Sequence, residues 1–308
     1  MHDVIIIGGG PAGVAAGVYS ARKKLKTLII TESFGGQSAI AESIENWIGA
    51  KKISGVEFAR MLEEHIRAQE NVEIKMPENA VDVKELSNGW EVATDKNNSY
   101  QSKVLIITSG GRRRRLNVPG EDKFEGKGVA YCSTCDAPIF KNKSVAVIGA
   151  GDAGLAAAVD LAQYAASVYL LSNKKSLIGD MSLQEIIKNS KKITMIMDAD
   201  VKEILGAQFV SGLKYFDKND NQIKELNVEG IFVEIGSTPN SEFIKKLVDT
   251  NQKGEIIIDH KTGATSRFGI FAAGDVTDEI YKQNNISAGD GVVAALSAYN
   301  YILNLKKI

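Results

Sequence analysis

The stretch Val4-Ile5-Ile6-Ile7-Gly8-Gly9-Gly10-Pro11-Ala12-Gly13 decides the fold, because the chain contains this pattern twice. It returns 141 residues later as Val145-Ala146-Val147-Ile148-Gly149-Ala150-Gly151-Asp152-Ala153-Gly154. Each copy is a short apolar, mostly β-branched run, then G-x-G-x-x-G, then an alanine-rich stretch. One such glycine motif is weak evidence, but two in the same strand–loop–helix context predict two dinucleotide-binding units.

The repeat continues beyond the glycine loops and indicates that one unit is inserted into the other. The same offset places a second strand, 27–32, on 168–173. Further short strands follow in each copy, at 81–83, 90–93 and 104–110 in the first and at 201–205, 213–216 and 230–236 in the second. A last strand at 268–275 and a helix at 287–305 complete the first unit. We therefore expect an α/β protein with two Rossmann-like, three-layer ββα dinucleotide-binding domains, one formed by 1–115 and 241–308 and the other by 116–240.

The composition is that of an ordinary globular protein of about two domains. The 308 residues include 37 basic and 38 acidic side chains, so general nucleic-acid binding has no electrostatic support. The longest apolar tract, 153–171, is interrupted by Asp160 and Gln163, and we expect no transmembrane helix and no membrane partner. The N-terminus lacks the positively charged start of a signal peptide, so we expect a cytoplasmic protein.

The glycines of the first loop have separate roles in holding a pyrophosphate. Gly8 allows the tight turn, Gly10 lets the backbone approach the ligand, and Gly13 lets the helix pack closely on the strand. Glu32 follows Gly13 by 19 residues, at the end of the second strand. A carboxylate in that position can accept hydrogen bonds from an adenosine ribose.

The second copy differs at the position that reads the ribose. Asn173 stands where Glu32 stands in the first copy, with Ser172 before it and Lys174 and Lys175 after it. Loss of the carboxylate removes a group that repels a 2′-phosphate, and the two ammonium groups can attract one. The alternative is that the lysines belong to a solvated loop without a ligand.

The only two cysteines, Cys132 and Cys135, form a C-x-x-C motif shortly before the second glycine unit. A zinc site needs four ligands, and the chain offers no second C-x-x-C and only three histidines. Two buried thiols without a function are a further alternative. A redox-active dithiol is favoured, because a thiolate at a helix start is stabilised there. Asp136 follows directly and can move a proton, or it is an ordinary first-turn acid.

These motifs together resemble the low-molecular-weight thioredoxin reductases, and equally the reductase part of the alkyl hydroperoxide reductase flavoprotein. Besides the glycine loops and Cys132-to-Asp136, the matching motifs are Gly35-Gly36-Gln37, Ile44-Glu45-Asn46-Trp47, Val118-Pro119-Gly120-Glu121 and Ala273-Gly274-Asp275, with Gln283 beyond. The resemblance covers nearly all of residues 3–305. It implies a homodimer with FAD in the outer domain, a nicotinamide nucleotide in the inserted domain, and a thioredoxin or thioredoxin-like protein as acceptor.

The resemblance also assigns roles to individual residues. It implies that Cys135 faces the flavin, that Cys132 attacks the partner protein, and that the domains rotate so that one dithiol meets both. The expected FAD residues are Gly8, Gly10, Pro11, Ala12, Gly13, Glu32, Gly36, Gln37, Asn46, Gly110, Gly274, Asp275, Gln283 and Ala288. The expected NAD(P)H residues are Gly149, Gly151, Asp152, Ala153, Gly154, Ser172, Asn173, Lys174 and Lys175.

Departures from the family pattern leave the electron donor open. The run from Ser172 to Asp180 lacks the arginines with which thioredoxin reductases bind the 2′-phosphate, and the acidic residue used for NADH by the peroxidase-linked relatives is also missing. NADPH, NADH, reduced ferredoxin and a deazaflavin therefore remain as donors. Two other functions remain as well: the reductase of a peroxiredoxin system that acts through a separate thioredoxin-fold carrier, and a redox-sensing module that holds FAD without turnover.

The run Arg112-Arg113-Arg114-Arg115 lies at the expected crossing between the domains. One interpretation is a docking site for an acidic partner or a cofactor phosphate, through bidentate guanidinium contacts. The other, which we favour, is a solvated charged linker. In an extended segment at most two of the four side chains can serve one site.

Overall fold

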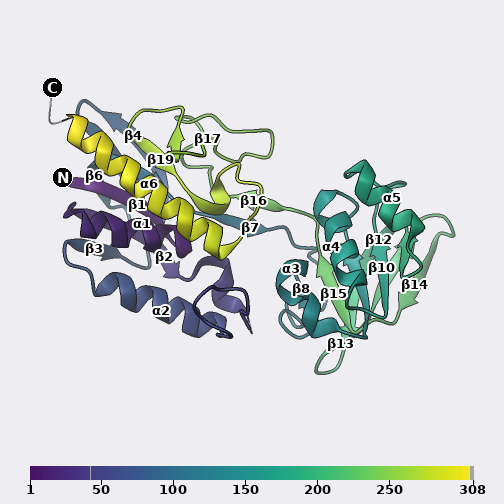
Figure 1. Cartoon of the computed structure of the whole chain (residues 1–308). Helices are drawn as coiled ribbons and strands as arrows, with labels where there is room; N and C mark the ends of the chain where they lie inside the picture. Colours follow the sequence, from purple (N-terminus) through teal and green to yellow (C-terminus); the bar gives the residue numbers. More distant parts are fainter. Residues whose placement is uncertain (42, 306–308) are drawn as a thin grey trace. The chain divides into compact units, whose positions relative to one another are not determined.

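The structure is a computed structural model that describes residues 1–41 and 43–305 of the chain. It divides into two compact units (Figure 1), Met1–Arg112 with Thr238–Ile308, called the first unit, and Arg113–Ser237, called the inserted unit. These divisions lie three residues before the expected boundaries at 115 and 240. Between the units the chain passes twice, through β7 (Gly111–Arg113) and β16 (Ser237–Pro239), and these two strands pair with each other.

The first unit is built on a nine-stranded sheet with a parallel centre. Its main order is β17-β18-β19-β6-β1-β2-β3, and β5 joins β6 and carries β4 at its far edge. The strands span His2–Gly9 (β1), Thr27–Phe34 (β2), Val72–Lys75 (β3), Ala80–Leu86 (β4), Gly89–Thr94 (β5), Ser99–Ile107 (β6), Ile258–Asp259 (β17), Ala264–Thr265 (β18) and Ile270–Ala272 (β19). Both faces of the centre are covered, since Val4 and Ile6 of β1 belong to one buried cluster and Ile5 and Ile7 to another.

Three helices cover one face of this sheet: α1 (Pro11–Arg22), α2 (Gly55–Arg67) and α6 (Asn284–Leu305). Proline occupies the first turn of α1, where its missing N–H costs nothing, and Ser54 caps α2 in a reciprocal capping box with Glu57. Helix α6 lies alongside α1 (Figure 1). A Cβ on Gly291 would lie 2.1 Å from the Ala12 carbonyl oxygen, so the absence of a side chain permits this close contact.

The inserted unit repeats the plan on a smaller scale. A five-stranded parallel sheet has the order β11-β10-β9-β15-β8. Its strands span Val129–Ala130 (β8), Ser144–Ile148 (β9), Ser167–Leu171 (β10), Ile193–Ile196 (β11) and Gly230–Val233 (β15). Helices α4 (Asp152–Ala162) and α5 (Met181–Asn189) pack on one face, where Val145 and Val147 point. The opposite face, with Ala146 and Ile148, is covered by an antiparallel sheet of β12 (Ala199–Gly206), β13 (Val210–Asp217) and β14 (Gln222–Leu226).

The expected fold class is therefore confirmed, with a helical layer, a parallel sheet and an antiparallel layer in each unit. The remaining elements are the short helix α3 (Ser133–Asp136) and the 3-10 helices η1 (Gly36–Ile40), η2 (Ala137–Phe140) and η3 (Gly274–Val276). None of the helices in the described ranges is long and apolar enough to span a bilayer.

Candidate active site

Parallel strands bring the predicted residues of the inserted unit to one edge of its sheet. In the order β10, β9, β15 and β8, the strands lead into Ser172, the glycine loop 149–154, Glu234 and Cys132. Because the carboxyl ends of parallel strands meet at one edge, the nucleotide loop and the cysteines share it, with β15 between them.

The first unit has the same layout at the corresponding edge. Strand β2 carries Glu32 near its end, β1 leads into the loop 8–13, β6 into Thr108, and β19 into Gly274 and Asp275. The correspondence is close in space as well as in order. A Cβ on Gly8 would lie 2.2 Å from the Thr108 carbonyl oxygen, and one on Gly149 would lie 2.2 Å from that of Glu234.

The cysteines lie at the start of α3 and form a disulfide. The Cα atoms of Cys132 and Cys135 are 5.3 Å apart, and Cys135 N donates a hydrogen bond to Cys132 Sγ at 3.2 Å. Cys132 is the N-cap of α3, and both cysteines are partly exposed. A pair held in this way can exchange with the disulfide of a partner.

Tyr131 fixes the chain just before the cysteines. Its hydroxyl donates to Glu121 Oε1 at 2.9 Å, and Glu121 is only 2% exposed. The same carboxylate accepts from the backbone N–H groups of Leu116 and Asn117, at 2.9 and 2.8 Å. The Val-Pro-Gly-Glu motif therefore anchors the segment that leads into the disulfide.

Two carboxyl groups near the disulfide have raised pKa values. Burial raises the pKa of Asp136 to about 6, and the positive charge of Arg113 opposes part of this effect. Burial also raises the pKa of Glu234 to about 7, against the opposing effects of a hydrogen bond from Ser133 N and the charge of Arg113. Asp160 Oδ2 accepts from Ser133 Oγ at 3.3 Å. Sequence reasoning identified Asp136 only, because the other acids follow distant elements.

The four arginines at the crossing do not form a common site. Arg112 pairs with Glu242 and donates to Asn240 Oδ1 at 2.8 Å. Arg113 lies over the ring of Tyr131, 5.3 Å from its centroid, and Arg115 pairs with Glu125 at 2.8 Å. These internal contacts favour the linker interpretation over a docking site.

The second glycine loop has the geometry that a pyrophosphate requires. A Cβ on Gly154 would lie 2.1 Å from the Gly149 carbonyl oxygen, whereas one on Gly151, the N-cap of α4, would meet nothing within 4 Å. The backbone at Gly151 is therefore open to a ligand. Asp152 Oδ1 accepts a hydrogen bond from Asp180 N at 2.7 Å and so holds the 177–180 loop beside Ala153.

The residues after β10 are exposed apart from Ser172. This serine is buried, and its Oγ accepts from Lys174 N at 3.1 Å. The Asn173 carbonyl accepts from Lys218 Nζ at 3.2 Å, and the Lys174 and Lys175 side chains extend into solvent.

The first unit offers a cradle that fits a dinucleotide. A Cβ on Gly36 would lie 3.5 Å from Gly10 Cα, so the two loops face each other with backbone alone. A Cβ on Gly13 would lie 1.9 Å from the Gly8 carbonyl oxygen, which requires glycine at that turn. Pro11 and Ala12 begin α1 directly after Gly10, and the helix start therefore faces the cradle.

Expected FAD residues from distant parts of the sequence contact one another. Gln37 Nε2 donates to Asp275 Oδ2 at 3.5 Å, and Asn46 Nδ2 donates to Gln283 Oε1 at 3.2 Å. Asp275 also accepts from Ser287, the neighbour of Ala288, at 3.1 Å. Glu32 is exposed and accepts from Asn79 Nδ2 at 2.6 Å, and Gly110 has a positive φ of 63° after the end of β6.

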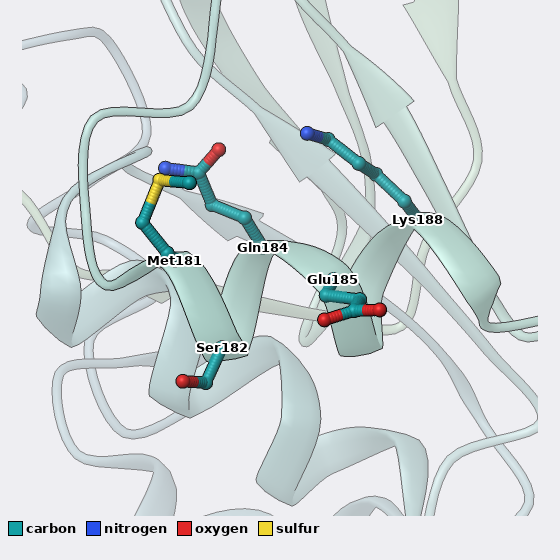
Figure 2. A pocket seen from close by; sticks show the side chains of 5 residues that line it. All are labelled: Met181, Ser182, Gln184, Glu185 and Lys188. Carbon is teal, nitrogen blue, oxygen red and sulfur yellow. The ribbon is translucent and has the colours of Figure 1, made fainter.

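A surface hollow of the inserted unit lies away from these residues. Figure 2 shows that it lies along α5, and its lining is Met181, Ser182, Gln184, Glu185 and Lys188. It includes none of the residues that the sequence selects.

The chain matches the family model described as "Pyridine nucleotide-disulphide oxidoreductase" over residues 2–291. The chain belongs to this family. A thioredoxin reductase from Streptococcus pyogenes is 34% identical with a TM-score of 0.91, and the match covers 99% of each chain. Among sequence relatives, an alkyl hydroperoxide reductase component of Pseudomonas aeruginosa is 42% identical over 304 residues, and an "NADH dehydrogenase" from Bacillus subtilis is 42% identical over 301.

These matches define a flavoprotein disulfide oxidoreductase of the thioredoxin reductase and alkyl hydroperoxide reductase type, with a C-x-x-C redox pair. The family implies FAD and a pyridine nucleotide. Each of the two sequence matches covers 98% of this chain but only 58% of the relative, so the chain spans little more than half of their length.

Proposed function

We propose that the protein is a thioredoxin-disulfide reductase, which passes electrons from NADPH through FAD and the Cys132–Cys135 pair to a thioredoxin-like protein. The observation that carries this proposal is the shared sheet edge of the inserted unit. There the disulfide and an open glycine loop follow neighbouring parts of one parallel sheet. A nucleotide-binding module without turnover has no need of a disulfide with a half-buried acid beside it.

The first unit is the site for FAD in this proposal. Its bare cradle at Gly10 and Gly36 fits a pyrophosphate, and Asp275 and Gln37 lie together at the same sheet edge. When bound, FAD supplies the chemistry that connects hydride transfer from a nicotinamide to two-electron thiol chemistry. Gln283 with Asn46 orders the start of α6, whose positive end favours electron-rich atoms.

Thiol–disulfide exchange requires both cysteines in the reduced state. The Cys132 thiolate attacks one sulfur of the acceptor disulfide, a new S–S bond forms, and the other acceptor sulfur leaves and takes up a proton. Cys135 then loses its proton and attacks Cys132 Sγ, which restores the internal disulfide and releases the second acceptor thiolate for protonation. Two electrons and two protons reach the acceptor, and Asp136 carries a proton between the thiols and the leaving groups.

The inserted unit binds the nicotinamide nucleotide in this proposal, with its pyrophosphate at Gly149, Gly151 and Gly154. Lys174 and Lys175 are exposed at the position that reads the ribose, so they are available to a 2′-phosphate. NADPH is therefore our first choice of donor over NADH.

Anaerobic reduction of the purified yellow protein by NADPH, NADH and reduced ferredoxin in turn tests the donor. Turnover with a thioredoxin disulfide then tests the acceptor. We expect bleaching of the flavin by NADPH and release of thioredoxin thiols, and loss of the second result alone in Cys135→Ser. Flavin reduction without thiol release by the native protein would contradict the proposed acceptor.

A second acceptor is the thioredoxin-fold carrier of a peroxiredoxin system. The sequence identity of 42% to a protein named for alkyl hydroperoxide reductase favours it. Reduction of such a carrier at a much higher kcat/KM than thioredoxin would assign this function instead.

A further inference from the structure

Glu234 occupies a central position at the active edge of the inserted unit. It directly follows β15, the strand between β9, which leads into the glycine loop, and β8, which leads into the cysteines. Its backbone N donates to the Ile148 carbonyl at 2.8 Å, and its own carbonyl lies against Gly149. These contacts fix where its side chain begins.

The carboxylate of Glu234 is joined to α3, the helix that carries the cysteines. It accepts a hydrogen bond from Ser133 N, the first residue of that helix. The charged groups that act on it come from three elements packed around it: Arg113 from β7, Asp136 from α3 and Asp160 from α4. One cation therefore faces three acids at this place.

The internal repeat supplies a comparison for this residue. Thr108 holds the same place in the first unit, against Gly8 instead of Gly149. Its hydroxyl donates back to the Ile7 carbonyl at 2.9 Å, within its own sheet. The fold is therefore satisfied by a small neutral side chain at this position, and an acid that reaches α3 serves something other than the fold.

We propose that Glu234 is a positioning residue for the dithiol, which holds the first turn of α3 through Ser133 and whose charge sets the pH at which Cys132 becomes a thiolate. This inference rests on the proposed exchange reaction, in which Cys132 is the attacking sulfur. Asp136 carries protons in that reaction, whereas Glu234 acts on Cys132 through the helix start.

The physical reason is competition for the N–H groups at the start of α3. One of them, from Cys135, points to Cys132 Sγ, and the next, from Ser133, points to Glu234. A carboxylate here repels a neighbouring thiolate, and a neutral carboxyl group does not. Burial brings the pKa of Glu234 to about 7, so its charge changes in the range where a thiol at a helix start also ionises.

The test measures thiolate formation directly. Cys135→Ser provides a background in which Cys132 is the only thiol. The alkylation rate of Cys132 by iodoacetamide is followed between about pH 5.5 and 9.5, with the modified peptide identified by mass. Glu234→Gln keeps a hydrogen-bond acceptor for Ser133 N but cannot ionise. Glu229→Gln is the matched control, because Glu229 precedes β15 at its other end and accepts from Ser144 N at 3.3 Å.

We expect Glu234→Gln to lower the midpoint of the alkylation profile by about 0.5–1 pH unit, which raises the rate near pH 6.5 by about 3- to 10-fold. Glu229→Gln should leave the midpoint where it is. In the background protein itself, the profile should show two steps, because the carboxyl group and the thiol titrate together. This second measurement needs no variant of Glu234 and serves if that variant does not fold.

An unchanged or raised midpoint in Glu234→Gln, or a single-step profile in the background protein, would overturn the proposal. A lowered midpoint in Glu229→Gln would also overturn it, since a distant acid would then have the same effect. Alkylation needs neither flavin nor nucleotide, so these results are separate from turnover with thioredoxin. Failure of turnover with the expected alkylation profiles would contradict the proposed function alone.

Discussion

Replacement of Asp136 by asparagine should stabilise the inserted unit at high pH while it slows disulfide exchange. Burial raises the pKa of this carboxyl group from 3.8 to about 6, so the folded protein favours the neutral form. Its contribution to stability is therefore complete below about pH 4 and is lost as the pH rises through about 6. A difference of about two pH units corresponds to about 3 kcal/mol in the free energy of unfolding. Asparagine has nearly the same shape and no charge, so Asp136→Asn should be more stable than the native protein by up to about 3 kcal/mol near pH 8.

Hydrogen exchange of peptides from β9 and α4 measures this gain, with denaturant unfolding by circular dichroism beside it. Tryptophan fluorescence is unsuitable, because Trp47 and Trp90 both belong to the first unit. Asp122→Asn is the control, since that side chain is 92% exposed. We expect no pH-dependent gain there. The reasoning is refuted if the difference between Asp136→Asn and the native protein does not grow between about pH 5 and pH 8. Normal turnover in Asp136→Asn would refute the proton-transfer role even if stability behaves as expected.

Three further changes test other parts of the site. Cys132→Ser should leave the Cys135 thiolate beside oxidised flavin and give a long-wavelength charge-transfer band, whereas Cys135→Ser should lack the band and trap the acceptor through Cys132; the band in the opposite variant reverses these roles. Glu121→Ala removes the acceptor of three buried hydrogen bonds and should destabilise the inserted unit by about 3–5 kcal/mol in denaturant unfolding. A loss below about 1 kcal/mol would show that water replaces the carboxylate. Lys174→Glu with Lys175→Glu should raise the KM for NADPH about ten-fold or more and leave that for NADH nearly unchanged, and an equal rise for both would show that the lysines do not read the phosphate.

The repeated strand and glycine motif was sufficient to predict both sheets, because the signal is local. Four apolar residues followed by G-x-G-x-x-G specify a buried strand, a tight turn and a helix start within one short segment. Helices α2 and α5 were not predicted. They follow equivalent strands, but the chain from β2 to α2 includes residues 35–54, about twice the length of the corresponding link between β10 and α5. The constant offset is lost there, and the comparison of the two copies then aligns unlike elements.

The site was predictable where one motif holds all its parts and unpredictable where folding assembles it. Cys132, Cys135 and Asp136 are adjacent in sequence, so their chemistry is evident from spacing. Glu234 and Arg113 approach them from β15 and β7, about 100 and 20 residues away in the chain. Their positions depend on strand order, and a single sequence gives no signal for that.

Comparison of the two copies separates what the fold requires from what the chemistry requires. Gly8 and Gly149 meet the same carbonyl at the same distance, so a close approach after the first strand belongs to the fold. Thr108 and Glu234 differ at that carbonyl, and only the second side chain reaches a helix with cysteines. By the same argument, the exchange of Glu32 for Asn173 marks the two units as binding different nucleotides. Changes at such paired positions should alter ligand choice or thiol reactivity more than stability, and transfer of the acid to Thr108 should give the first unit no redox function.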